Sequence, residues 1–271
     1  MQVWIRVCEV RHRERREFAE RIALLERGVT YPLGDDAFEL DHGTDYFAFF
    51  DRLGELTYLA ALDGERVVAV VAAILRRVPD VPGAGEKRAW YLCDLKVHAD
   101  YRRRRIPWRI FSHAMLHQYP RCGRVYGISM DAPGSSENPV ASLASRMKLI
   151  PVSVATTLYI YSLSASEMER TSAVLEVSRG PLTFLSLRGK KDLIMRSSHR
   201  PMPLLHVQFG PCAEHGLDHP VEGHVHMFCT PAGDALVASL DALGLKPDAS
   251  ATVIQHRMGD WDWRFVLTSD I

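Results

Sequence analysis

The stretch at residues 92–111 reads LCDLKVHADYRRRRIPWRIF and combines a strand, a polar turn and the beginning of a helix. Its apolar residues before position 98 are typical of a strand, and Ile106 and Ile110 lie one helical turn apart. Four consecutive arginines stand at residues 102–105, where the helix is expected to begin. A helix N-terminus carries unpaired N–H groups and a partial positive charge, so this turn is suited to bind a pyrophosphate group.

A β-hairpin is predicted upstream of this stretch. Two apolar runs, at residues 57–62 and 66–75, flank Asp63-Gly64, and Asp-Gly between apolar runs is a strong hairpin signal. The other elements expected before the hairpin are a strand at residues 2–9, a helix at 13–27, a loop at 30–44 and a short helix at 45–53.

Strands and helices alternate after residue 97. The pattern predicts a helix at residues 103–118, a strand at 124–130, a helix at 138–148 and a strand at 152–163. A run of three strands followed by this alternation indicates an α/β (α+β) fold. We therefore expect a mixed, mostly antiparallel sheet that is flanked by helices.

The remaining sequence predicts a second, smaller α/β domain. We expect a first domain at residues 1–163, a polar linker at 164–178 and the second domain at 179–271. A helix at residues 232–243 is followed by strands at 251–256 and 263–268. This order is similar to that of residues 124–163, so a degenerate second copy of the same half-fold is one interpretation.

Composition limits the classes of partner. Lys plus Arg and Asp plus Glu both total 33, so the net charge is zero and favours neither nucleic acid nor an anionic membrane as a partner. The five cysteines form no Cys-x-x-Cys, which is typical of reduced thiols. The longest apolar run, residues 67–75, is too short to span a bilayer. We expect a cytoplasmic protein, and we leave open whether it forms a homo-oligomer.

The strand-turn-helix stretch resembles the GNAT superfamily of N-acetyltransferases, whose turn has the form Arg/Gln-x-x-Gly-x-Gly/Ala. Tyr101 and Arg102 match the start of this turn, and Arg105 and Pro107 occupy its two glycine positions. Residues 95–97 match the strand that pairs with the pantetheine arm in that family. Asn138-x-x-Ala141 is similar to a later segment that lies beside the cofactor.

The resemblance implies acetyl-CoA or another acyl-CoA as co-substrate. The residues that it places beside the cofactor are Leu95, Val97, Arg102, Arg103, Arg104, Arg105, Ile106, Arg109 and Asn138. The arginines add direct pairing with phosphate. The arginine cluster is also suited to contact an acidic acyl carrier protein, which is the alternative donor.

In the mechanism that the resemblance implies, a primary amine of a small molecule or amino acid attacks the thioester directly. A backbone N–H near Val97 would polarise the carbonyl, and Asp94 or His98 would act as base. Ser145 stands where many family members place the Tyr that protonates the leaving thiolate. The alternatives without a catalytic role are that Asp94 faces solvent on an alternating strand and that His98 is only a turn residue.

The replaced glycines and the missing Tyr leave a second reading open, in which the protein is a non-catalytic GNAT-like binding or assembly module. A third reading, a metal-dependent function, rests on Cys and His residues close together in the sequence, namely Cys212, His215, His219, His224 and His226. Their spacing matches no zinc pattern, so we predict no metal ligand.

Overall fold

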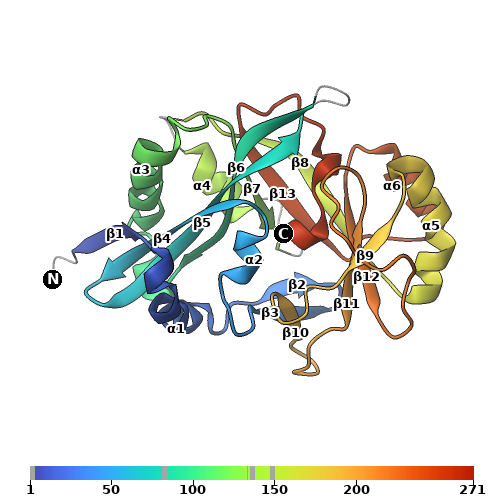
Figure 1. The fold of residues 1–271 in the computed structure, drawn as a ribbon, viewed down its shortest axis with the longest axis horizontal. Coiled ribbons are helices and arrows are strands. Elements are labelled where there is room, and N and C mark those ends of the chain that lie inside the picture. Colours follow the sequence, from blue (N-terminus) through green and yellow to red (C-terminus); the bar gives the residue numbers. More distant parts are fainter. Residues whose placement is uncertain (1–3, 81–84, 133, 135–137, 147–149) are drawn as a thin grey trace.

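The computed structural model describes residues 4–80, 85–132, 134, 138–146 and 150–271. These residues form a ten-stranded sheet in the order β1-β4-β5-β6-β7-β13-β8-β12-β11-β9 (Figure 1). Its strands are β1 (Ile5–Glu9), β4 (Glu55–Asp63), β5 (Arg66–Pro79), β6 (Glu86–Val97), β7 (Val125–Met130), β13 (Ala249–His256), β8 (Ser153–Leu163), β12 (Val225–Pro231), β11 (Leu204–Gln208) and β9 (Thr183–Leu185). All neighbouring pairs except β6–β7 and β11–β12 are antiparallel. The mixed, mostly antiparallel sheet predicted from the sequence is therefore confirmed.

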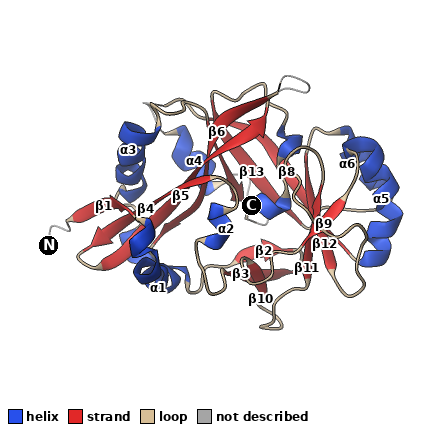
Figure 2. Ribbon diagram, in the orientation of Figure 1, coloured by secondary structure: helices blue, strands red, loops and turns tan. Residues whose placement is uncertain are grey.

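Helices cover both faces of the sheet (Figure 2). Side chains alternate between the faces of a strand, so β5 contacts helix α1 (Arg15–Glu26) through Val70 and helix α3 (Ile106–Gln118) through Val71. Helix α4 (Pro139–Ser145) contacts β8 and β13, while α2 (Ala48–Asp51) contacts β4. None of the helices in the described ranges is long and apolar enough to cross a membrane.

The strands β6 and β7 pair only briefly. Their parallel ladder runs from Trp90 and Val125 to Leu92 and Gly127, and α3 is the crossover between them. Beyond Leu92, β6 contains a register shift in its pairing with β5, and Asp94 adopts a left-handed backbone with φ +57°. The sheet therefore opens into a split between the C-terminal parts of β6 and β7.

The C-terminal residues complete the sheet rather than lying beside it. Strand β13 pairs with both β7 and β8, so a late segment occupies the centre of the sheet. The segment 164–178, predicted as a linker, consists of the N-cap Ser164 and most of α5 (Ala165–Arg179). Helices α5 and α6 (Ala235–Ala242) pack on the half of the sheet that contains β8, β12 and β11. Whether residues 1–163 and 179–271 are separate domains stays a prediction.

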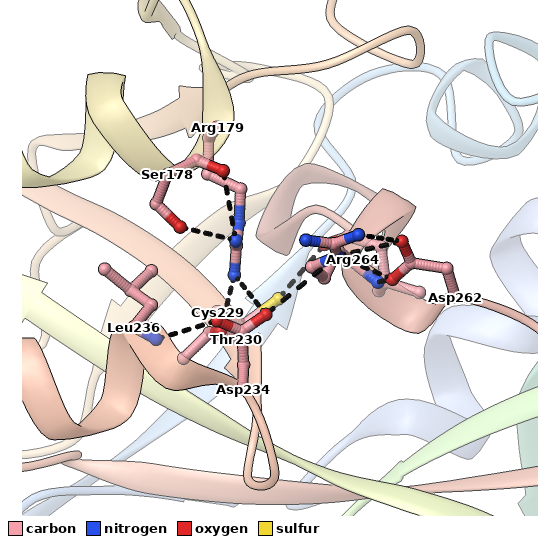
Figure 3. A network of polar contacts seen from close by, with 9 residues as sticks. Ser178, Arg179, Cys229, Thr230, Asp234, Leu236, Asp262 and Arg264 are labelled. Atoms are coloured by element: carbon pink, nitrogen blue, oxygen red, sulfur yellow. Dashed lines mark hydrogen bonds and ion pairs between the residues drawn. The ribbon is translucent and has the colours of Figure 1, made fainter. Parts of the chain in front are cut away.

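A buried arginine ties this half together (Figure 3). Arg179, at the end of α5, donates to Thr230 Oγ1 at 2.8 Å and pairs with Asp234 at 2.9 Å. Asp234 also caps α6, because its Oδ1 accepts from the Leu236 N–H at 2.8 Å. One guanidinium group thus fixes α5, β12 and α6 relative to one another.

Two local predictions are wrong. The loop expected at residues 30–44 contains β2 (Tyr31–Leu33) and β3 (Asp36–Asp41), which form a small sheet with β10 (Asp192–Met195). Pro32 is accommodated because β2 is the edge strand. The strand expected at residues 263–268 is replaced by two short 3-10 turns, η3 (Trp263–Phe265) and η4 (Thr268–Asp270). The carboxylate of Asp262 accepts the Arg264 N–H and so favours a turn over a strand.

Candidate functional site

A cavity of about 320 Å³ lies where β6 and β7 separate. Leu92 and Asp94 of β6 and Gly127 and Ile128 of β7 are among the residues that line it. It continues on both sides of the sheet, since its wall includes Met115 of α3 as well as residues from the opposite face. The lining residues on the α3 and α4 side include Phe111, Ala114, Leu143 and Ala144, and those on the other side include Phe49, Phe50, Lys191, Leu193 and His206.

The C-terminal turn closes the second side of the cavity. Thr268, Asp270 and Ile271 line it, and the C-terminus lies near the centre of the molecule (Figure 1). Asp270 is held by Arg76 at 3.0 Å, and its carbonyl oxygen accepts a hydrogen bond from the Tyr91 hydroxyl at 2.9 Å. The last residues therefore form a fixed part of the wall.

A buried polar cluster lies beside the split. Asp94, whose side chain is 5% exposed, accepts hydrogen bonds from Tyr46 at 2.7 Å and from Tyr58, and it pairs with Lys96. Lys96 also pairs with Glu26, from the end of α1. One ammonium group and two phenols thus compensate two buried carboxylates.

The cluster keeps Asp94 ionised. Burial raises the pKa of Asp94. The charge of Lys96, electrostatic interaction with His42 and hydrogen bonds from Lys96 and Tyr58 together outweigh burial, so the pKa is lowered. Burial lowers the pKa of Lys96, but the negative charges of Asp94 and Glu26 raise it by more than burial lowers it, so Lys96 remains charged. A carboxylate with a lowered pKa is a weak proton acceptor, and it is better suited to hold a cationic group in place.

The same cluster contains three residues whose side chains can bind a metal ion. Atoms of Glu26, His42 and Asp94 lie within 4.8 Å of one another. Lys96 contacts both carboxylates, so a cation already compensates their charge. In the His-rich stretch, His226 Nε2 accepts the Val221 N–H at 3.1 Å, and no three ligand atoms of the described histidines and cysteines there gather in this way.

No known protein-family model matches the sequence. A tandem GNAT protein from the clavulanic acid biosynthesis pathway superposes on 96% of this chain and 100% of its own, with a TM-score of 0.50 and 11% identity. The chain has the GNAT fold. This result confirms the fold expected from the strand-turn-helix stretch.

Two further proteins are similar to this GNAT-fold chain. N-myristoyltransferase of Saccharomyces cerevisiae, solved with myristoyl-CoA, is 10% identical and matches 100% of this chain and 83% of its own, with a TM-score of 0.48. The uncharacterized protein L340 of Acanthamoeba polyphaga mimivirus is 20% identical over 240 residues, which cover 84% of this chain and 68% of its own.

The arginine turn lies at the surface of this GNAT fold. Arg102, Arg103, Arg104, Arg105 and Arg109 are exposed around the start of α3. Arg103 and Arg105 adopt left-handed backbones, with φ +63° and +57°. Arg105 therefore keeps, at the family's first glycine position, a conformation that glycine adopts without strain. Ile106 is fully buried and packs in the apolar core beneath α3, so the structure does not place it at a ligand-facing surface.

The two strand residues predicted to contact the cofactor differ, because Val97 does not line the cavity. Leu95 lines the cavity. His98 donates its N–H to Val68 O at 2.8 Å, and hydrogen-bonded positions alternate in an antiparallel ladder, so Val97 directs its N–H away from β5. This is the side from which β7 has diverged. Asn138 instead uses its side chain within the protein, since Oδ1 caps α4 and Nδ2 donates to Ser129 O at 3.1 Å.

The three predicted catalytic residues do not come together. Asp94 lines the cavity, whereas His98 and Ser145 do not. His98 accepts the Asp100 N–H, as a turn residue does, and Ser145 is exposed and donates to Ser142 O at 2.9 Å. The solvent-facing alternative for Asp94 is wrong, because the register shift in β6 turns this side chain into the buried cluster.

Sequence reasoning missed most partners of Asp94. Lys96 follows it by two residues, so the period of a strand was a usable signal. Tyr46 and Tyr58, which donate to Asp94, and Glu26, which pairs with Lys96, come from distant parts of the chain, and no pattern in the sequence connects them.

Proposed function

We propose that this protein is an N-acyltransferase that moves an acyl group from acyl-CoA, or from an acyl carrier thioester, to the primary amine of a small molecule or amino acid. The observation that carries the proposal is the cavity that passes through the β6–β7 split of a GNAT fold. A direct transfer needs donor and acceptor to meet at one point, and a passage between the two faces of a sheet allows each to enter from its own side.

In this proposal the donor occupies the α3 side. The start of α3 and its exposed arginines hold the phosphates of CoA, because N–H groups, the helix dipole and guanidinium groups all favour an anion there. The Val97 N–H polarises the thioester carbonyl as negative charge develops on its oxygen. The apolar wall formed by Phe111, Met115 and Leu143 receives the acyl group.

The acceptor then occupies the opposite side, near Asp94 and the C-terminal turn. Its neutral amine nitrogen attacks the thioester carbonyl carbon, the C–N bond forms, and the C–S bond breaks with its electrons on sulfur. The amine loses one proton, and the thiolate gains one. Asp94 acts here by orienting the amine rather than by taking its proton, since its pKa is lowered.

We further propose that the two parts of the chain bind different substrates. Residues 1–163 bind the donor, while residues 179–271 supply β13 and the acceptor-side wall that includes Lys191 and His206. A C-terminal region that completes the cavity supports this arrangement.

The test measures free thiol released from acyl-CoA in the presence of a panel of amines. The double variant Arg102→Ala with Arg105→Ala should lose donor affinity, and the matched double variant Arg196→Ala with Arg200→Ala removes two exposed arginines elsewhere. Loss confined to the first pair supports the proposal. Equal acyl-CoA affinity in the unchanged protein and both double variants would refute the assignment of the CoA phosphates to the start of α3. Binding without thiol release under any amine would favour a non-catalytic module.

A further inference from the structure

Lys191 is a buried cation without an anionic partner. It is 8% exposed and lines the cavity on its acceptor side. Its ammonium group lies over the ring of Phe49, 4.2 Å from the centroid, and no hydrogen bond or ion pair to it is found in the described part of the chain. Burial lowers the pKa of Lys191 to about 7, because the ammonium group is less well solvated there than in water.

Three side-chain carboxylates around this end of the cavity are already engaged. Asp94 and Glu26 pair with Lys96, and Asp270 pairs with Arg76 at 3.0 Å. Each of them has a cation within ion-pair distance, whereas Lys191 has none among the described residues. An anion that entered the cavity would give Lys191 the partner that it lacks among the described residues.

His206 offers a complementary group on the same wall. Its ring is 3% exposed, and Nδ1 lies 3.0 Å from Thr268 Oγ1. The Thr268 hydroxyl donates its only proton to Met227 O at 2.9 Å, so it must accept a hydrogen bond from His206 Nδ1–H. Burial, and then the charges of Lys191 and Arg52, lower the pKa of His206 to about 3, so the ring is neutral.

The tautomer follows from these contacts. With its proton on Nδ1, His206 carries a lone pair on Nε2, and this atom is buried without a partner among the described residues. A buried acceptor without a donor is costly to leave unsatisfied, as is a buried ammonium group without an acceptor. Lys191 and His206 together match a ligand that contains both an anionic group and an N–H group.

We propose that the cavity binds an amino carboxylic acid as the acyl acceptor, with its carboxylate on Lys191 and its amine N–H on His206 Nε2. This inference rests on the proposed function and names its acceptor class. A carboxylate gives Lys191 a charge-assisted hydrogen bond and favours its charged form, which has no anionic partner among the described residues. The apolar residues of the same wall, Phe50 and Leu193, surround the remainder of the ligand.

The experiment compares each amino acid with its own amide, which replaces the carboxylate by an uncharged group of nearly the same shape. Glycine, leucine and phenylalanine and their three amides are titrated calorimetrically into the free protein and into the protein saturated with CoA. We expect at least one acid to bind roughly ten- to a hundredfold more tightly than its amide, the range typical of a charged hydrogen bond. Lys191→Met should abolish this preference, and the exposed neighbour variant Lys190→Met should keep it.

Acyl-CoA affinity is measured on the same variants. Unchanged acyl-CoA affinity in Lys191→Met shows that the variant is folded. If none of the proteins binds acyl-CoA, the proposed function is refuted, whereas the comparison of acids with amides still tests the carboxylate site. Equal binding of acids and amides, no binding of any acid, or a preference that survives Lys191→Met would overturn the inference. A preference for succinyl-CoA over butyryl-CoA that Lys191→Met removes would assign the carboxylate to the donor and overturn the acceptor assignment.

Discussion

Replacing Lys96 by Met removes the cation that two buried carboxylates share. The side chain of Lys96 is 6% exposed, and those of Asp94 and Glu26 are 5% and 14% exposed. Removal of one partner from a buried ion pair typically costs about 3–5 kcal/mol, because the remaining charge cannot return to water. Tyr46 and Tyr58 still donate to Asp94 in the variant, so we expect the lower end, about 3 kcal/mol.

Thermal and chemical denaturation followed by circular dichroism measure this loss. For a chain of this size, about 3 kcal/mol corresponds to a decrease in Tm of roughly 6–12 °C. Lys246→Met is the matched control, because Lys246 and its partner Asp241 are 74% and 60% exposed. An exposed pair of this kind contributes less than about 1 kcal/mol.

A double variant separates charge from packing. Glu26→Gln removes one of the two carboxylates that Lys96 compensates, so Lys96→Met with Glu26→Gln should cost less than the sum of the single variants. If Lys96→Met and Lys246→Met differ by less than about 1 kcal/mol, the cluster does not depend on its buried cation and the reasoning is refuted.

The remaining predictions concern the turn, the acid limit and the C-terminal half. Arg105→Gly should raise the free energy of unfolding by roughly 1 kcal/mol, because Arg105 has a left-handed backbone with φ +57° that is strained for a residue other than glycine. Arg104→Gly should not raise it. Denaturant titration compares the two variants, and equal effects would contradict the backbone strain at Arg105. The folded-state pKa of Asp94 is lowered, so its contribution to stability is present above about pH 4 and is lost as the pH falls through the folded-state value. Asp94→Asn should therefore flatten the dependence of the free energy of unfolding on pH in this range. An unchanged pH dependence would contradict the shift. Arg179→Met should cost about 3 kcal/mol in thermal denaturation and Arg170→Met, exposed on the same helix, much less; similar costs would rule out a structural role for the buried pair.

The fold was predictable from the sequence because its strongest signals are local. Asp63-Gly64 between apolar runs predicts the β4–β5 hairpin, and the arginine turn before Ile106 predicts the strand-turn-helix unit. The edge hairpin of β2 and β3 was missed because Pro32 and Gly34 are typical of loops. Nothing in the order of elements indicates that β13 enters between β7 and β8, since this pairing depends on long-range packing.

The candidate site was predictable only where one strand carries it. Asp94 and Leu95 were found because they belong to the motif-bearing strand, and both line the cavity. Lys191 was missed because it lies in a charged stretch beside Lys190 and Asp192, which is typical of a solvated loop. His206 was missed because it is an isolated histidine in a mostly apolar strand, and only the assembled C-terminal half places both residues on the wall. Ser145 followed from the spacing of the family motif, but the structure leaves its side chain at the surface.

The central claim is that the β6–β7 split holds an acyl donor whose phosphates lie at the start of α3. Calorimetric titration of the purified protein with acetyl-CoA and with a longer acyl-CoA tests it most directly. We predict that at least one donor binds, that its affinity falls as salt concentration rises, and that Arg102→Ala with Arg105→Ala weakens it. Absence of binding by both donors at high concentration would contradict the claim and would leave the acyl carrier thioester or a non-catalytic module in its place.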